Sequence, residues 1–150
     1  MKRVSSIVGL AAIAASDGKL LGNVEQVYLH AGGKLVQGLM IKPRRLIAGR
    51  CFARLKRVRM FGEISVIVEK AEKPPALAEQ VLIFGQKVLG TTGEKLGWIT
   101  DILIDENDGR VISVELSQGY WDDWMKGRTM LNDFTVQPCG VIAVERSLSS

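Results

Sequence analysis

The stretch GEKLGWITDILIDENDGR, residues 93–110, decides the fold because a second version of it stands 75 residues earlier. That version is GKLLGNVEQVYLHAGGK, residues 18–34. Glycines and apolar positions match between the two stretches while polar positions differ, which indicates a shared fold and not a shared active site. A period of this length predicts a duplicated domain rather than a solenoid array. The matched glycines are Gly18 with Gly93, Gly22 with Gly97 and, after one inserted residue, Gly33 with Gly109.

Each copy consists of short apolar runs separated by turn residues. Residues 111–116 alternate, with Ile112, Val114 and Leu116 on one face, as a half-buried strand does. No window keeps a period of 3.6 residues over three turns, so long α-helices are not expected. Five or six short strands in each half predict an all-β protein of two small barrels.

A proline-containing linker separates the copies, because Pro74 and Pro75 stand side by side within residues 70–80. Domains of about 75 residues bury only around 60% of their unfolded surface, so the halves are expected to pack together or to form a homo-oligomer. The expected divisions are a first barrel over residues 1–70, a linker over residues 71–80 and a second barrel over residues 81–150.

The second copy resembles the PRC-barrel family through the frame GxxLGxxxDxxxDxxxGRVxxxxL. The resemblance implies a six-stranded, SH3-like β-barrel, and the repeat extends it to two tandem SH3-like PRC β-barrels. Members of the family, such as the reaction-centre H subunit and the C-terminal domain of the ribosome-maturation factor RimM, mostly bind proteins or help to assemble ribonucleoprotein. The frame is filled here by Gly93, Leu96, Gly97, Asp101, Asp105, Gly109, Arg110 and Val111.

The first copy departs from this frame at two acidic positions. Gln26 stands in place of Asp101, and His30 stands in place of Asp105. The fold therefore does not require these carboxylates, which slightly favours a functional role for them in the second copy.

The N-terminal segment MKRVSSIVGLAAIAASDG has the composition of a short signal peptide, but the repeat argues against that interpretation. Residues 7–8 align with residues 82–83, which open the second copy, so cleavage after Ala14 would remove a strand. Cys51 and Cys139 are not equivalent in the repeat and lack metal-ligand spacing. We therefore expect a cytoplasmic protein with two reduced core thiols.

No group of residues has the spacing of an enzyme's site. The acidic run at residues 105–109 fails the calcium-loop pattern, because Arg110 and Leu116 stand where a glycine and a bidentate glutamate belong. A turn built from Asn-Asp-Gly is expected instead. His30 is the single histidine and has no partner at the spacing of a triad or a zinc site. The sequence predicts no enzyme activity, no metal and no cofactor.

Charge is divided unevenly between the halves, although the net charge is only +4. Residues 1–73 carry 14 Lys and Arg against 5 Asp and Glu, whereas residues 74–150 carry 6 against 11. The segment KPRRLIAGRCFARLKRVR, residues 42–59, contains eight cations and no acid. Its counterpart in the second copy, QGYWDDWMKGR, is aromatic and acidic. The same loop thus carries opposite chemistry in the two copies.

Three interpretations of the basic segment remain open. The cations are a solvated strand face, or they contact nucleic acid or the ribosome by neutralising phosphates. The third interpretation is contact with an acidic protein surface, including Asp122 and Asp123 of this protein, which would meet Arg44 and Arg45 within or between chains. The candidate basic patch comprises Arg44, Arg45, Arg50, Arg54, Lys56, Arg57 and Arg59.

The aromatic loop has two interpretations. It forms a lid over an open end of the barrel, or it is an exposed anchor for a partner, since Trp and Tyr are frequent at interface hot spots. Stacking on bases ranks lower because the two neighbouring carboxylates repel phosphate. The candidate partner-binding residues are Tyr120, Trp121, Asp122, Asp123 and Trp124.

The sequence therefore predicts a non-enzymatic PRC-barrel adaptor or assembly module that binds a protein partner. The alternative is a ribosome- or RNA-associated maturation factor that uses residues 42–59. Peripheral membrane association has the same basic segment in its favour, but an amphipathic helix or lipidation motif is missing.

Overall fold

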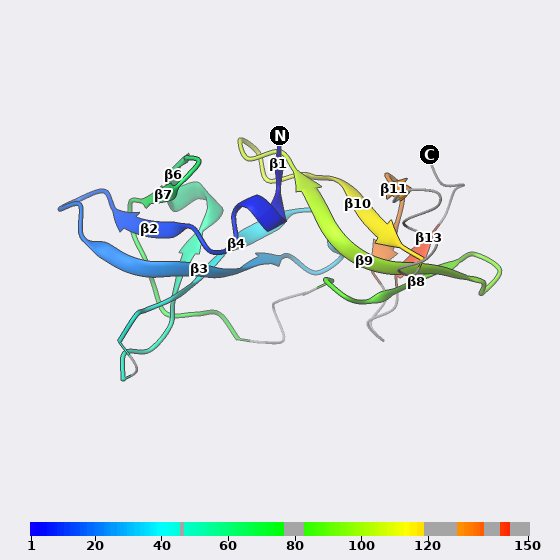
Figure 1. Ribbon diagram of the computed structural model, residues 1–150, viewed down its shortest axis with the longest axis horizontal. Coiled ribbons are helices and arrows are strands. Elements are labelled where there is room, and N and C mark those ends of the chain that lie inside the picture. The colour runs from blue at the N-terminus through cyan, green and yellow to red at the C-terminus, as the bar shows by residue number, and fades with distance from the viewer. Residues whose placement is uncertain (46, 77–82, 119–128, 137–141, 145–150) are drawn as a thin grey trace.

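The computed structural model describes residues 1–45, 47–76, 83–118, 129–136 and 142–144, and these ranges form strands and two short 3-10 helices. The two halves lie next to each other along the long axis of the molecule (Figure 1). The prediction of an all-β protein is confirmed. Within the described ranges, no helix has the length and apolar character needed to cross a membrane.

Each half contributes one sheet. The first comprises β2 (Ala11–Ala14), β3 (Leu20–Leu29), β4 (Val36–Lys42), β5 (Cys51–Arg54), β6 (Val58–Phe61) and β7 (Ser65–Val68). The second comprises β8 (Lys87–Gly90), β9 (Lys95–Ile104), β10 (Val111–Ser117), β11 (Thr129–Leu131), β12 (Thr135–Val136) and β13 (Ile142–Val144). Strand β1 (Lys2–Arg3) comes from the N-terminus but pairs with β9 of the second sheet.

The two sheets have the same strand order. It is β5-β4-β3-β2-β7-β6 in the first sheet and β11-β10-β9-β8-β13-β12 in the second. The long central hairpins β3–β4 and β9–β10 are antiparallel. The pairs β2–β7 and β8–β13 are parallel in both halves. The repeat seen in the sequence is therefore a repeat of topology.

The difference in length between the copies lies in the first hairpin turn. Strands β9 and β10 begin 75 residues after β3 and β4, and Val27 opposite Leu39 corresponds to Ile102 opposite Val114. The insertion predicted before Gly109 is therefore wrong. Five residues separate β2 from β3, whereas four separate β8 from β9. Exposed turns absorb such changes because no core contact depends on them.

The N-terminal segment is part of the first sheet. Strand β2 covers Ala11–Ala14 and pairs with both β3 and β7, so cleavage after Ala14 would remove it. The predicted alignment of Ile7 with Leu82 is wrong by one residue. Ile7 corresponds to Ile83, because the carbonyl oxygens of both accept a backbone hydrogen bond from the residue three positions later.

In each sheet, a short connection joins the two strands that stand at the ends of the strand order. The 3-10 helix η2 (Leu55–Arg57) links β5 directly to β6, and residues 132–134 link β11 to β12. In the described ranges no ladder pairs β5 with β6 or β11 with β12. The sheets are thus curved so that their end strands are neighbours in sequence, while a closing ladder is not seen.

The two halves share one hydrophobic core. A single cluster of buried side chains includes Ile7 and Leu39 of the first half together with Ile102, Leu131 and Phe134 of the second. The second 3-10 helix, η1 (Val4–Ser6), adds Val4 to this cluster and lies against β9. Burial of apolar surface therefore holds the halves together as it holds each half.

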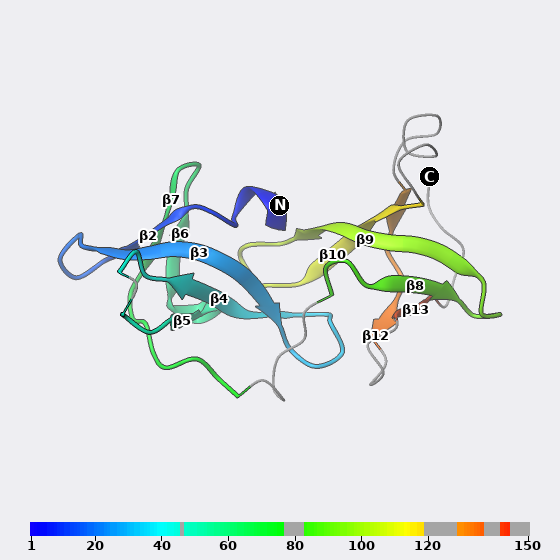
Figure 2. The same ribbon diagram turned by 60° about the horizontal axis from the view of Figure 1, so that its bottom comes forward.

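The two central hairpins meet between the halves (Figures 1 and 2), where Leu35 and Arg110 form an antiparallel bridge just before β4 and β10. The Val36 N–H donates to the Gly109 carbonyl at 2.7 Å, and the Val111 N–H donates to the Lys34 carbonyl at 2.9 Å. A Cβ on Gly109 would stand 2.3 Å from Leu55 Cδ2, and one on Gly33 would stand 2.5 Å from Val136 Cγ2. Both glycines adopt positive φ, so they serve the turn and the contact between halves.

Candidate functional site

The basic segment does not form one continuous patch. It runs from the end of β4 through the β4–β5 loop, along β5 and η2, and into β6. Strand β5 has four residues and thus spans about 13 Å at the usual rise per residue. The cations before β5 and those after it therefore lie at opposite ends of this strand.

Four cations gather around the β4–β5 loop. They line a solvent-open hollow of about 430 Å³, which we call the basic hollow. Its lining residues are Asn23, Lys42, Pro43, Arg44, Arg45, Ala48 and Arg50.

One cation of the basic hollow is neutralised by a carboxylate. The Arg50 guanidinium donates to both carboxylate oxygens of Glu25, at 2.7 and 2.9 Å. The hydrogen bond from Arg50 lowers the pKa of Glu25. Arg44 donates to the neutral Asn23 Oδ1 at 3.3 Å. No described carboxylate pairs with Arg44 or Arg45, whereas Lys42 is near enough to Glu25 to contribute to lowering the pKa of that carboxyl.

An apolar side chain projects beside these cations. Ile47 is 98% exposed on the β4–β5 loop, three residues before Arg50. Exposed apolar side chains are ordinary on protein surfaces, but one at the tip of a cationic loop combines an anchor with a charged rim. The loop therefore has the composition of a contact surface rather than of a solvated strand.

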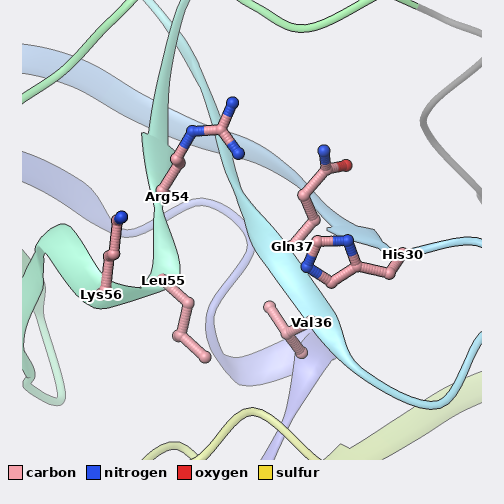
Figure 3. Close-up of a pocket in the computed structure, with 6 residues that line it drawn as sticks. All are labelled: His30, Val36, Gln37, Arg54, Leu55 and Lys56. Carbon is pink, nitrogen blue, oxygen red and sulfur yellow. The ribbon is translucent and has the colours of Figure 1, made fainter.

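A second hollow of about 400 Å³ lies at the other end of β5. We call it the His30 hollow. Figure 3 shows that its side chains come from three segments: the end of β3, the start of β4 and the junction of β5 with η2. Arg54 is paired there with Glu72 at 2.5 Å, whereas no described carboxylate pairs with Lys56. Its lining residues are His30, Val36, Gln37, Arg54, Leu55 and Lys56.

The remaining cations of the predicted patch lie beyond this second hollow. Arg57 is exposed on η2, and Arg59 lies on β6, where it is 3.5 Å from the Glu69 carboxylate. Three of the seven candidates, Arg50, Arg54 and Arg59, thus have acidic partners from neighbouring segments of the first half. Fewer than the eight cations of residues 42–59 are therefore available to bind a ligand.

Asp101, one of the two acidic positions of the sequence frame in the second copy, joins the two halves. Asp101 is 6% exposed, and its carboxylate accepts hydrogen bonds from the Ser5 backbone N–H at 3.1 Å and the Ser5 hydroxyl at 2.6 Å. Arg3 lies 3.5 Å from the same carboxylate and 2.6 Å from the buried Glu115. This position therefore holds the N-terminal segment of the chain, which accounts for an acid in the second copy and Gln26 in the first.

The acidic run at residues 105–109 is a turn, as predicted. Asp105 Oδ1 accepts the Asn107 N–H and Asp108 Oδ1 accepts the Arg110 N–H, both at 2.9 Å. The hydrogen bond from the Arg110 N–H lowers the pKa of Asp108. The described residues contain no cluster of three His, Cys, Asp or Glu that could hold a metal ion.

The aromatic loop lies outside the described residues. Its candidate residues Tyr120, Trp121, Asp122, Asp123 and Trp124 therefore stay predictions, as does any pairing of Asp122 and Asp123 with Arg44 and Arg45. Cys139 also lies outside them. Cys51 is half-buried, and burial raises the pKa of its thiol, which favours the protonated form.

Residues 81–146 match the PRC-barrel domain. This match gives the second half a PRC-barrel domain, and it does not extend to the first half, although the first sheet has the same strand order. No curated protein matches the chain.

Sequence reasoning missed the His30 hollow. His30 was expected to be an isolated polar residue at a strand end, and Gln37 was not singled out. The residues that line the hollow stand up to 26 positions apart and meet because β4 pairs with both β3 and β5. The repeat contained a usable signal. His30 stands where the second copy has Asp105, and the first copy also carries the basic segment at residues 42–59.

Proposed function

We propose that this protein is a non-enzymatic adaptor that binds an acidic surface of a protein partner through the basic hollow. The observation that carries the proposal is the gathering of Lys42, Arg44 and Arg45 in one solvent-open hollow, where Arg44 and Arg45 have no described carboxylate partner. Ile47 on the same loop supplies an apolar anchor. PRC-barrel relatives that bind proteins are consistent with this role, but the fold by itself does not assign it.

The two halves have different tasks in this proposal. We propose that the first half is a second, diverged copy of the PRC barrel, which is supported by its identical strand order and by the three-residue link between its end strands. The shared core packs the two halves against each other. A partner held by the first half would then be presented at a constant distance from the PRC-barrel domain of the second half and its aromatic loop.

The physical roles of charge and apolar contact are distinct. The three cations accelerate the encounter with an acidic surface, and this effect falls with salt because the Debye length is only about 8 Å at physiological ionic strength. Full burial of the Ile47 side chain contributes about 1.5–3 kcal/mol. The apolar anchor therefore sets the lifetime of the complex, while the cations set its rate of formation and its orientation.

The test is a quantitative affinity capture from native lysate, divided in two, with nuclease added to one part. The proposal expects a discrete protein that survives nuclease and is lost when Arg44→Glu and Arg45→Glu are combined, and also with Ile47→Ser. A matched control combines Arg57→Glu with Lys73→Glu, which changes the net charge equally at exposed positions away from the basic hollow.

Two outcomes would overturn the proposal. Captured material that disappears with nuclease would identify the RNA- or ribosome-associated alternative, in which phosphates occupy the basic hollow. A protein lost equally with the matched control would mean that net charge, and not the basic hollow, attracts it. Trp121→Ala, made in the same background, tests whether the aromatic loop is a second anchor.

A further inference from the structure

The His30 hollow is lined by cationic, polar and apolar side chains. Lys56 and His30 are exposed and have no described carboxylate partner, whereas Arg54 is paired with Glu72. Val36 and Leu55 form an apolar wall that continues to Gly109 of the second half. The hollow thus offers both positive charge and an apolar surface.

Gln37 adds a polar group that the fold leaves unsatisfied. Its side chain is among the lining of the hollow, the residue is 6% exposed, and its Oε1 has no hydrogen-bond partner within the described part of the chain. Buried carbonyl oxygens nearly always have a donor, because a missing one is destabilising. An unsatisfied acceptor in the wall of a hollow marks a place for the N–H group of a ligand.

We infer that the His30 hollow binds the C-terminal residue of a polypeptide. Such a residue carries three groups on one carbon: a carboxylate for Lys56 and His30, a backbone N–H for the Gln37 carbonyl, and a side chain for the wall of Val36 and Leu55. An aliphatic side chain fits this wall best. The volume of about 400 Å³ is in the range of small-ligand sites and suffices for one or two residues.

In the cell the occupant would be the C-terminus of the protein partner, and to that extent the inference rests on the proposed function. The chemistry of the hollow is nevertheless independent of the basic hollow, which lies at the other end of β5. The two hollows have no lining residue in common. Each can therefore be disabled without touching the other.

The experiment titrates the full chain with acetyl-Gly-Gly-Gly-Leu and follows backbone amide chemical shifts by NMR. The free acid should bind about tenfold more tightly than its C-terminal amide, because the amide lacks the charge-assisted hydrogen bonds. Equal affinity of acid and amide would overturn the inference. N-acetyl-leucine distinguishes the source: binding weaker than that of the tetrapeptide supports a chain terminus, whereas equal binding assigns the hollow to a free small acid.

Two variants localise the site. Lys56→Gln should weaken the free acid several-fold, while Arg57→Gln, one residue further and outside the hollow, should leave it unchanged. Gln37→Met should weaken binding and at the same time raise the thermal midpoint of the unliganded protein, because it removes an unsatisfied buried carbonyl. A purely structural glutamine would give the opposite change in midpoint and would contradict the inference.

A last variant separates this inference from the proposed function. The combination of Arg44→Glu with Arg45→Glu, which is expected to abolish partner capture, should bind the tetrapeptide within twofold of the unchanged chain. Loss of tetrapeptide binding in that variant would show that the two hollows are one site and would overturn the assignment. Retained tetrapeptide binding alongside a failed capture would leave the His30 hollow standing and refute only the role of the basic hollow.

Discussion

Removal of the Asp101 carboxylate tests whether this residue fastens the N-terminal segment to the second half. In Asp101→Ala the Ser5 N–H and hydroxyl lose their acceptor, and so does the buried Ile102 N–H, which donates to Asp101 Oδ1 at 2.8 Å. Hydrogen bonds to charged groups contribute roughly 1.5–3 kcal/mol each, but water replaces part of the two from the exposed Ser5. We therefore expect a loss of about 3 kcal/mol in the free energy of unfolding.

The assay is urea denaturation, with thermal unfolding as a second measurement. For a chain of this size, 1 kcal/mol corresponds to roughly 2–4 °C, so the midpoint should fall by about 6–12 °C. Gln26→Ala is the matched control at the equivalent position of the first half, where the side-chain Oε1 has no described partner. That variant should change the free energy of unfolding by less than about 1 kcal/mol.

A double-mutant cycle distinguishes this role from a general loss of packing. If Asp101 acts through Ser5, then Ser5→Ala should cost little more once Asp101→Ala is present, with a coupling of about 1–2 kcal/mol. Additive losses would refute the reasoning, as would a loss in Asp101→Ala no larger than that in Gln26→Ala.

Two further predictions concern backbone geometry and pH. Gly97→Ala should lower the free energy of unfolding by about 2–4 kcal/mol, because the φ of Gly97 is +142° and an added Cβ would stand 2.4 Å from the Ser117 carbonyl oxygen. Gly93 also has a positive φ, but an added Cβ would meet open space. In the same urea titrations, Gly93→Ala should therefore lower the free energy of unfolding by about 1 kcal/mol less than Gly97→Ala. Because Arg50 lowers the pKa of Glu25, this pair stabilises the fold above the ordinary glutamate pKa of 4.5 and the contribution is lost as pH falls through the lowered value. The stability difference between the unchanged chain and Arg50→Gln should therefore be present at pH 7 and vanish in acid, and a difference that grows as the pH falls would contradict this.

The repeat was readable from the sequence because it depends on local backbone requirements. Glycines with positive φ, such as Gly22 and Gly97, recur where a turn or a close approach of backbones demands them. The turn at residues 105–109 was likewise predictable, since its hydrogen bonds connect residues two positions apart. The one-residue error in aligning the copies arose because two turn glycines, Gly33 and Gly109, look equivalent but stand at different places in loops of equal length.

The candidate site could be predicted only as a composition. The sequence marked residues 42–59 as basic, but the carboxylates that neutralise part of it, Glu25, Glu69 and Glu72, come from other strands. Which cations stay free depends on strand pairing, and pairing brings together residues that are distant in the chain.

The sequence by itself determined the all-β class, the repeated pattern of strands, the turns and the opposite charge of the two halves. Each of these follows from the preferences of single residues or of near neighbours along the chain. Only the tertiary structure decided that the halves share one core, that Asp101 holds Ser5, and that His30, Gln37 and Lys56 surround one hollow. These features depend on the packing of one sheet on another and on strand register, which apolar patterns allow in many arrangements and which only the complete set of contacts selects.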